Sequence, residues 1–223
     1  MDVIKFIREH RAYFEDFVTR STYHSNAIEG NTLSYAETYA ILFNDNSMKV
    51  TATAREFYEA INHKYALSRA LENPEEELSE RIIMDIARAI NKNINETSGY
   101  RRVPVLIAAA EHIPPAPDQI NQQMMQLVYE HNSDHETDPF LREACFHLRF
   151  ERIHPFEDGN GRTGRILLNR ALIREQIAPV VIPIERRATY MEMLAQCDDI
   201  ALAGLFKELS EAEEDRIRTF AQI

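Results

Sequence analysis

The sequence predicts an all-α protein that carries one small β-hairpin, and three observations lead to this fold class. Apolar residues recur at steps of three, four and seven along most of the chain, which is the period of amphipathic helices. Glycine is scarce, with six among 223 residues, and half of the six lie in the single stretch 154–165. One segment, 100–115, departs from the helical period and contains a short run typical of a strand.

The composition is that of a soluble globular protein. Hydrophobic residues make up 44% and charged residues 27% of the chain, and 223 residues suffice for one sizeable core, alone or with a helical appendage. The net charge of −11 argues against nucleic acid as the main partner, because phosphate backbones are bound through surplus Lys and Arg. Any polyphosphate ligand must therefore be held by a local arrangement of groups.

Cysteine usage and hydropathy favour a cytoplasmic protein. Cys145 and Cys197 lie far apart without a CxxC or metal-site spacing, so we expect two reduced thiols, with a disulfide between them left open. The amino-terminal residues carry frequent charges and lack the apolar run of a secretory signal. No window approaches 18 uncharged apolar residues, so no membrane span is expected.

The amino-terminal region is predicted to be helical throughout. Apolar residues from Val3 to Phe17 follow a helical period and predict the first helix. The segment 21–31 is predicted to form a second, short helix, which Gly30 ends as a carboxy-terminal cap. Ser34 and Glu37 have the spacing of a capping box, which predicts a helix over 34–43.

The rest of the chain is also predicted to be mainly helical, with helices over 51–73, 78–95, 118–131, 137–152, 161–177, 187–196 and 202–221. In the exceptional segment, Pro104 precedes the β-type run 105–107, and Pro114-Pro115 closes it. A short hairpin fits this pattern better than a connecting loop with apolar filler. No repeat, low-complexity tract or Gly/Ser linker divides the chain, so one all-α domain with a hairpin is predicted.

The stretch HPFEDGNGRTGR, residues 154–165, carries the clearest chemical signal. Pro155 cannot continue the preceding helix, so His154 is expected at a helix end, at the mouth of a loop. Phe156 is expected to anchor that loop in the core. Gly159-Asn160-Gly161 can turn successive backbone N–H groups inward as a nest for anionic oxygens, and a helix beginning near Arg162 points its partly positive end at the same place.

Charged side chains around this loop add the remaining parts of a phosphate site. Arg162, Arg165 and Asn169 share one helix face, and arginine supplies forked, permanently charged donors suited to phosphate. Asp158 or Glu157 could hold Mg²⁺, which takes one or two carboxylates plus substrate phosphates. These parts predict a nucleotide polyphosphate site with a histidine as general base. The alternative is a capped helix start beside a surface histidine.

The motif HPFEDGNGR, with Arg165 following, resembles the signature of Fic-domain proteins, HPFx(D/E)GNGRxxR, at every fixed position. It is not a P-loop, because the Gly-Lys-Ser/Thr element is missing. Residues 99–115 are similar to the Fic flap, a hairpin that clamps a target peptide. The resemblance spans about residues 50–205. It implies an amino-terminal helical region over 1–49 and a catalytic core over 50–223, with the flap at about 100–115, the active-site loop at 154–165, and carboxy-terminal helices.

The resemblance also implies a role for each residue of the motif. The reaction is transfer of AMP from ATP, with Mg²⁺ or Mn²⁺, to a Ser, Thr or Tyr hydroxyl of a target protein, and glycine at 161 favours this over the kinase branch, which has lysine there. The implied roles are general base for His154, metal ligand for Asp158, anion hole for Gly159, Asn160 and Gly161, phosphate contact for Arg162, and γ-phosphate contact for Arg165.

A second stretch, SNAIEGN at 25–31, is similar to the family's inhibitory motif (S/T)xxxE(G/N). Ser25 and Glu29 share one helix face, a spacing that by itself is equally typical of an ordinary capped helix. The resemblance implies an inhibitory helix over about 21–30, in which Glu29 pairs with Arg165 and displaces the γ-phosphate. In some relatives the corresponding glutamate also positions water for removal of AMP, so a hydrolytic role for Glu29 is left open.

Three alternatives to an autoinhibited AMP transferase remain at this point. The donor could carry another group, such as UMP, phosphate or phosphocholine, because the loop recognises phosphates. The chain could be a nucleotide-binding interaction module without turnover, although an intact His154 argues against it. It could be a toxin with a separate antitoxin, which Ser25 and Glu29 make unnecessary. ATP and a target protein bound through the flap are the expected partners, a homodimer is left open, and neither nucleic acid nor membrane is expected.

Overall fold

A computed structural model of the chain describes residues 2–43, 49–107 and 112–222, and all regular structure in these ranges is helical. The α-helices are α1 (Val3–Glu9), α2 (Arg11–Ile28), α3 (Tyr35–Phe43), α4 (Ala54–Ala70), α5 (Glu80–Asn91), α6 (Ile120–Ser133), α7 (Pro139–Ile153), α8 (Asn160–Arg174), α9 (Arg187–Gln196) and α10 (Asp199–Phe220). Two short 3₁₀ turns, Pro117–Gln119 and Ile184–Arg186, precede α6 and α9.

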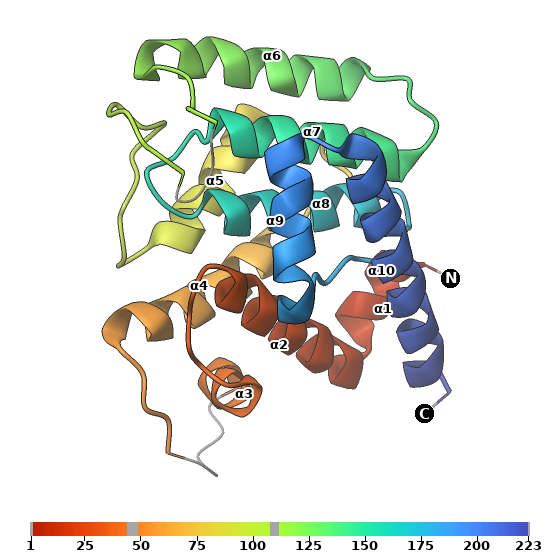
Figure 1. Cartoon of the computed structure of the whole chain (residues 1–223). Helices are drawn as coiled ribbons and strands as arrows, with labels where there is room; N and C mark the ends of the chain where they lie inside the picture. The colour runs from red at the N-terminus through yellow and green to blue at the C-terminus, as the bar shows by residue number, and fades with distance from the viewer. Residues whose placement is uncertain (1, 44–48, 108–111, 223) are drawn as a thin grey trace.

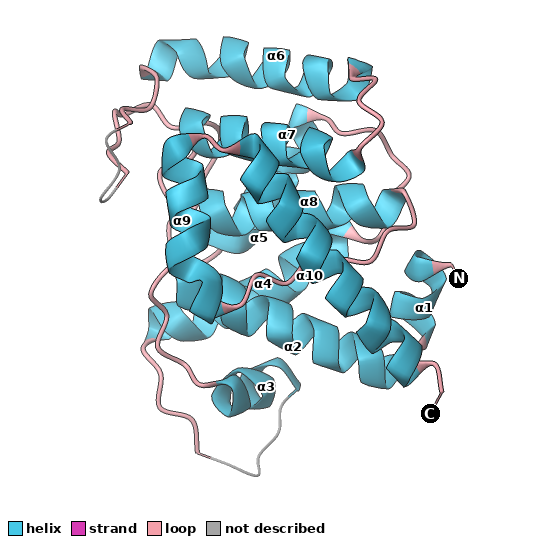
Figure 2. Ribbon diagram, turned by 45° about the vertical axis from the view of Figure 1, so that its right-hand side comes forward, coloured by secondary structure: helices cyan, strands magenta, loops and turns pink. Residues whose placement is uncertain are grey.

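Helix α8 lies at the centre of the bundle (Figures 1 and 2). It packs against α7, α5, α4, α2 and α1, and twelve of its 15 residues are buried. Helix α6 lies beside α7 at one end of the molecule, α10 packs against α7, and α3 lies outside the bundle beside α2 and α4. The amino end of the central helix is therefore held from several sides, which fixes the loop that precedes it.

The apolar core joins the amino-terminal helices to the rest of the chain. Tyr13 and Phe17 of α2 are fully buried and belong to one cluster with Leu67 of α4, Ile83 of α5 and Ile217 of α10. Burying a side chain of this size stabilises the fold by about 1.5–3 kcal/mol. A second cluster, between α7, α8, α9 and α10, is centred on Tyr190 and Phe206. Helix α2 is therefore anchored along its length, and its carboxy-terminal end has a defined position.

The predicted helices are confirmed, with one difference near the amino terminus. The break lies at His10, so the expected short helix over 21–31 is the end of the 18-residue helix α2. His10 leaves the helical conformation, and its ring nitrogen Nδ1 accepts a hydrogen bond from the N–H of Tyr13 at 3.2 Å. Histidine is a weak sequence signal for a helix cap, so the sequence pattern does not predict a break between helices at His10. Gly30, with φ of +96°, follows the end of α2 as expected.

The expected hairpin at 100–115 is not confirmed. Residues 108–111 of this segment lie outside the described residues, and 100–107 and 112–115 contain no strand. The guanidinium of Arg101, which is 3% exposed, donates to the carbonyl oxygens of Val103 at 3.0 Å and Pro115 at 2.7 Å. These carbonyls are thus satisfied by one arginine rather than by a facing strand. Arg101 also donates to the carbonyl of His154 at 2.8 Å, which ties the segment to the 154–165 loop.

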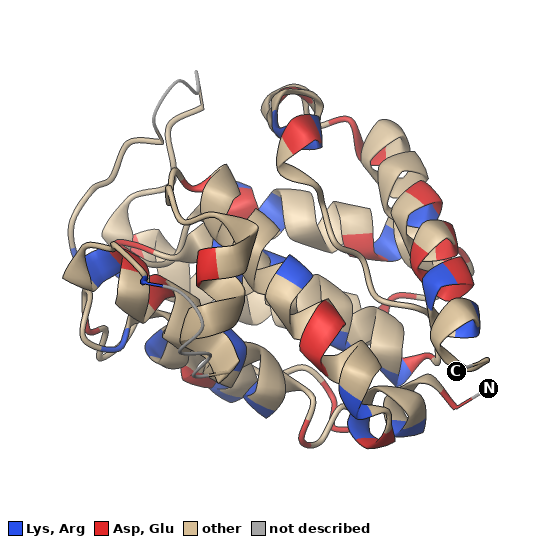
Figure 3. Cartoon of the chain, turned by 90° about the horizontal axis from the view of Figure 1, so that it is seen from below, with Lys and Arg blue, Asp and Glu red and all other residues tan. Residues whose placement is uncertain are grey.

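Charges are mixed on the surface, although the net charge is −11. Figure 3 shows acidic and basic residues interspersed on the same helices. Many are paired one turn apart, as in Arg218–Glu214 at 2.7 Å and Arg11–Glu15 at 2.8 Å. In the described part of the chain, no helix has both the length and the apolar character needed to cross a membrane. Both cysteines are free thiols, as expected.

Candidate active site

His154 lies at the junction of α7 and the loop that leads to α8. It has a left-handed backbone, with φ of +48°, which ends α7 while its N–H still donates to Phe150 at 3.0 Å. Ring nitrogen Nδ1 lies 3.3 Å from the carbonyl oxygen of Glu151, which accepts only from a protonated Nδ1. In the neutral ring this leaves Nε2 with a free lone pair. Burial lowers the pKa of His154 below its usual 6.5, so the neutral form dominates at pH 7.

The loop between His154 and α8 is closed by its own side chains. Asn160 accepts from the N–H of Phe156 at 2.9 Å and donates to the carbonyl of the same residue at 2.8 Å. Gly159 has φ of +78°, and a Cβ there would lie 2.7 Å from Ile90, so no larger residue fits. Both polar ends of the Asn160 side chain are thus engaged within the loop. Only the backbone of Asn160 is therefore available to bind a ligand.

Arg162 is the most buried cation of the site. Its guanidinium is 2% exposed and lies between two carboxylates, Asp158 at 2.9 Å and Glu59 at 3.2 Å. Its Nε atom has no hydrogen-bond acceptor among the described residues, and Nη1 lies 3.2 Å from Oε1 of Glu59 without hydrogen-bond geometry. An unmade hydrogen bond of a buried donor costs about 1–3 kcal/mol, and more if the group is charged. The unpaired Nε donor is therefore the part of Arg162 that best fits an anionic oxygen of a ligand.

The structure brings Ser25 and Glu29 next to Arg165, which lies 140 and 136 residues further along the chain. Arg165 donates through Nε to the Ser25 hydroxyl at 2.9 Å and through Nη2 to the Ser25 carbonyl at 2.9 Å. Nη2 also lies 2.7 Å from Oε1 of Glu29. Burial lowers the pKa of Arg165, but the Glu29 charge beside it outweighs this and the net direction is upward, so the guanidinium stays charged.

The carboxylate of Glu29 lies directly over the first turn of α8. A Cβ added to Gly161 would be only 2.3 Å from its Oε1 atom. Backbone N–H groups at the start of a helix attract anions, so this is the place where a phosphate would bind. A larger residue at 161 would therefore have to displace the ends of the Glu29 and Arg165 side chains from their present positions. Glu29 is 34% exposed and Arg165 only 7%, so the pair closes the site from the solvent side.

Asp158 is an ionised carboxylate at the entrance of the site, whereas Glu157 is exposed. Asp158 lies 2.5 Å from Arg55 and 2.9 Å from Arg162; burial raises its pKa, but these two guanidiniums outweigh that effect and hold it below the usual range. The described residues contain no group of three His, Cys, Asp or Glu that could cage a metal. One charged carboxylate still suits Mg²⁺, since substrate phosphates complete its coordination. Asp158 would be the protein ligand.

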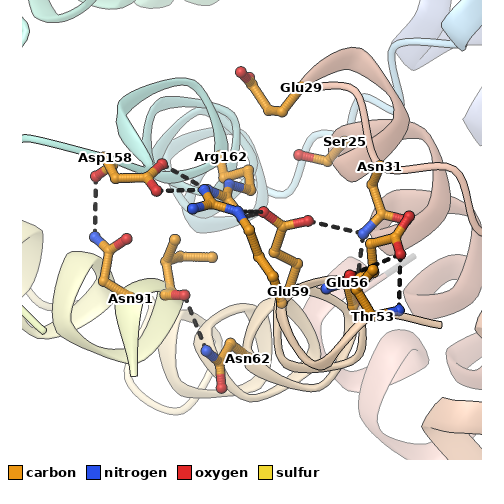
Figure 4. A network of polar contacts seen from close by, with 12 residues as sticks. Ser25, Glu29, Asn31, Thr53, Glu56, Glu59, Asn62, Asn91, Asp158 and Arg162 are labelled. Carbon is orange, nitrogen blue, oxygen red and sulfur yellow. Dashed lines mark hydrogen bonds and ion pairs between the residues drawn. The ribbon is translucent and has the colours of Figure 1, made fainter. Parts of the chain in front are cut away.

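A polar pocket of about 300 Å³ lies between α2, α4 and the start of α8. Figure 4 shows the polar contacts around it, with Glu29 and Ser25 on the α2 side, Glu59 on α4, and Arg162 and Asp158 on the α8 side. Its lining includes Glu29, Asn31, Arg55, Glu59, Asp158 and Arg162. The pocket can receive phosphate oxygens at Arg162 and a metal at Asp158, and His154 and Arg165 are not among its lining residues.

Several residues of this site could not be recognised from the sequence. Arg55 and Glu59 belong to a helix whose periodicity indicates only that it is amphipathic. The one sequence feature that could have pointed to Glu59 is a carboxylate beside Ala60 and Asn62, which are also buried. Asn169, predicted to share the arginine face, instead pairs with the backbone of Val180 at 2.6 and 2.9 Å. Its role in the structure is to hold the chain after α8.

Glu151 is a further carboxylate under the site, 13% exposed as a side chain and with its Oε1 atom buried. Burial raises its pKa to about 8, and its Oε1 atom has no hydrogen-bond partner among the described residues. The imidazole of His147 lies 3.9 Å from that oxygen and 2.6 Å from the hydroxyl of Tyr190. Glu151 is therefore protonated at neutral pH in this state.

The Glu151→Gln variant is expected to be more stable than the parent at pH 8 and equally stable near pH 4. The folded protein holds the Glu151 proton up to about pH 8, whereas the unfolded chain releases it near pH 4.5. Stability from this group is thus lost as pH rises between those values, by up to about 1.4 kcal/mol per pH unit for one proton. Urea unfolding of both proteins from pH 4 to 8 measures the difference. A constant difference over that range would contradict a protonated Glu151.

These features define a class: an all-helical protein with a glycine-rich loop before its central helix and a carboxylate of its own chain beside the first turn of that helix. Residues 77–172 match the model of the Fic/DOC family. The chain contains a Fic domain of that family.

Known proteins agree with this assignment. The chain is 34% identical over 179 residues to protein adenylyltransferase fic-1 of Caenorhabditis elegans, covering 77% of this chain and 35% of that protein. It is 34% identical over 198 residues to protein adenylyltransferase Fic of Nematostella vectensis, covering 84% of this chain and 44% of that protein. The chain thus spans less than half the length of these curated relatives.

Two solved structures share the fold. A Fic-domain-containing signalling protein from Bacteroides thetaiotaomicron superimposes with a TM-score of 0.76 at 24% identity, covering 99% of this chain and 95% of that one. Fic-1 of C. elegans superimposes with a TM-score of 0.76 at 28% identity, covering 95% of this chain and 64% of that one. The first likeness shows the fold alone, and it extends over both the amino-terminal helices and the core.

Proposed function

We propose that this chain is an autoinhibited protein adenylyltransferase that transfers AMP from ATP, with Mg²⁺, to a Ser, Thr or Tyr hydroxyl of a target protein and to itself. The curated relatives that carry this name support the reaction. The observation that carries the proposal is the Glu29 carboxylate, which lies over Gly161 and 2.7 Å from Arg165, at the amino end of α8. A site made to attract phosphate is blocked by an internal anion.

The proposed transfer step uses His154, Arg162 and the first turn of α8. Nε2 of His154 accepts the proton of the target hydroxyl, whose oxygen forms a bond to the α-phosphorus of ATP. The bond from that phosphorus to the bridging oxygen breaks, and pyrophosphate leaves. Arg162 and the N–H groups at the start of α8 stabilise the negative charge on the phosphate oxygens. A bound Mg²⁺ would neutralise further phosphate charge, with Asp158 as its protein ligand.

The flap segment is the proposed docking site for the target. Val103, Leu106 and Ile113 are exposed apolar residues there, at 47%, 83% and 74%. Arg101 ties the segment to the carbonyl of His154 at 2.8 Å, so a peptide held along it would lie beside the general base. Exposed backbone at such a segment recognises a peptide mainly through main-chain hydrogen bonds.

Intact-mass and peptide mass spectrometry test the proposed reaction. The Glu29→Gly protein is incubated with ATP and Mg²⁺, alone and in a lysate, in parallel with UTP and CDP-choline. A mass increase of one AMP on a hydroxyl residue is the expected result. If the protein is modified only with another donor, the transferred group is not AMP. If no donor gives any modification, the result favours a nucleotide-binding module without turnover.

Asp158→Asn is expected to lower AMP transfer about 10²-fold and to remove its dependence on Mg²⁺, because a metal supplies several kcal/mol to a phosphoryl-type transition state. Asparagine has nearly the same size as aspartate but carries no negative charge. The rate is measured against Mg²⁺ concentration in the Glu29→Gly background. Glu157→Gln, one residue away and exposed, serves as the control. A larger loss in the control would place the metal ligand at 157.

A further inference from the structure

Glu59 of α4 connects the inhibitory segment to the phosphate-binding arginine. Its side chain is 8% exposed, and each of its oxygens has a different task. Oε1 lies 3.0 Å from Nε of Arg55 and 3.2 Å from Nη1 of Arg162. Oε2 accepts a hydrogen bond from the side-chain amide of Asn31 at 2.8 Å. One buried carboxylate thus contacts three segments of the site (Figure 4).

Asn31 is positioned to hold Glu29 in place. It is two residues beyond Glu29, past the left-handed Gly30, and its N–H donates to the carbonyl of Asn26 at 3.1 Å. Its side-chain oxygen accepts from the N–H of Leu33 at 3.0 Å, which fixes the turn. The side-chain nitrogen Nδ2 of Asn31 takes no part in this turn and donates to Glu59 of α4. The turn and the contact with Glu59 are therefore made by different atoms of one side chain.

A second set of hydrogen bonds also joins the segment after Gly30 to α4. Thr32 donates through its N–H at 3.0 Å and its hydroxyl at 2.6 Å to Oε1 of Glu56, whose other oxygen caps the start of α4 at Thr53. Both acceptors are carboxylates, so the two contacts differ in their exposure: the Thr32–Glu56 pair is exposed, whereas the Asn31–Glu59 contact is partly buried. A hydrogen bond sheltered from water is electrostatically stronger than an exposed one, so we take Asn31 and Glu59 as the main attachment.

We propose that the Asn31–Glu59 contact is a latch that holds the inhibitory carboxylate over the phosphate site, and that Glu59 is a positioning residue shared by the latch and Arg162. The inference rests on the proposed function. It assigns a role to two residues outside the catalytic motif and beyond Gly30, where the inhibitory motif ends. Loss of the latch frees the end of α2 while Arg165, Glu29 and His154 remain intact.

The Asn31→Asp variant tests the latch, because it keeps the oxygen that accepts from Leu33 and replaces the donor by a charge that repels Glu59. AMP transfer is expected to rise about tenfold over the parent, the effect of losing one hydrogen bond to a charged group. In the Glu29→Gly background the same change is expected to add nothing. Asn31→Ala, which removes the donor without adding charge, serves as a second variant if Asn31→Asp folds poorly.

Asn132→Asp is the matched control, since this exposed asparagine donates to the carbonyl of Leu78 at 2.8 Å, away from the site. Hydrogen exchange without nucleotide gives a readout that does not depend on catalysis. Amides at 26–31 are expected to exchange about tenfold faster in Asn31→Asp and to stay unchanged in Asn132→Asp.

The outcomes separate the latch from the proposed function. Unchanged exchange at 26–31 would overturn the latch whatever the activity. Faster exchange with no gain of transfer, in a protein that Glu29→Gly does activate, would overturn it as well. Faster exchange with Glu29→Gly itself inactive toward ATP would support the attachment and count against AMP transfer.

Discussion

Replacing Glu29 by glycine is expected to raise adenylylation, including self-modification, about 10²-fold or more over a near-silent parent. The carboxylate lies over Gly161, where phosphate charge must bind, and holds Arg165 at 2.7 Å. Its removal frees both the helix amino end and the guanidinium. One well-placed donor at such a centre is worth about 10²–10³-fold in rate, and the variant restores more than one. Incorporation of labelled AMP measures the gain.

Folding of the Glu29→Gly protein should be weakened only moderately. Arg165 is buried but keeps two hydrogen bonds to Ser25, at 2.9 Å each, and Glu29 is 34% exposed. The expected cost lies between that of a surface pair and that of a buried one, at about 1–2 kcal/mol. Thermal unfolding of the two proteins checks this figure. Glu29→Gln, which keeps the size and removes the charge, should show intermediate activity.

Arg165→Ala provides the contrast to this gain. It should be inactive with or without Glu29, because it removes the anchor of the brake and of the substrate together. The double variant Glu29→Gly/Arg165→Ala is the informative sample. Activity equal to that of Glu29→Gly alone would show that Glu29 does not act through Arg165.

Loss of His154 is the second large effect expected. In the Glu29→Gly background, His154→Ala should lower transfer about 10²–10⁴-fold while ATP binding stays within a few-fold, because a general base acts on the hydroxyl and not on the nucleotide. Calorimetric titration with ATP and single-turnover transfer measure the two quantities separately. A variant that transfers at the normal rate would remove His154 from the mechanism.

The backbone at this position calls for a second variant. His154 has φ of +48°, where alanine is strained and asparagine is tolerated, so His154→Asn separates chemistry from folding. His135→Ala, at an exposed histidine, is the matched control. Because burial holds the pKa of His154 below 6.5, the parent base stays neutral and the acid limb of its pH–rate profile should lie below pH 6.5.

Much of the catalytic loop could be predicted because its chemistry is contiguous. His154, Asp158, Gly159, Arg162 and Arg165 lie within twelve residues, and helix ends, glycine conformations and arginine spacing are local properties. The same holds for the helices, whose apolar period is visible in any short window. His10 shows the limit, since a ring nitrogen capping a helix leaves no distinctive pattern.

The helical fold, the position of the histidine before a glycine-rich helix start, and a serine and a glutamate one turn apart near Gly30 can all be read from local sequence patterns. The place of that glutamate in the folded protein cannot, because it depends on tertiary packing. Packing of α2 against α8 closes 136 residues of chain between Glu29 and Arg165, and burial of Tyr13 and Phe17 fixes the approach. Contacts over such separations depend on how the whole core packs. The roles of Arg55, Glu59 and Asn31 follow from that packing, because each is set by a neighbour from a distant part of the chain.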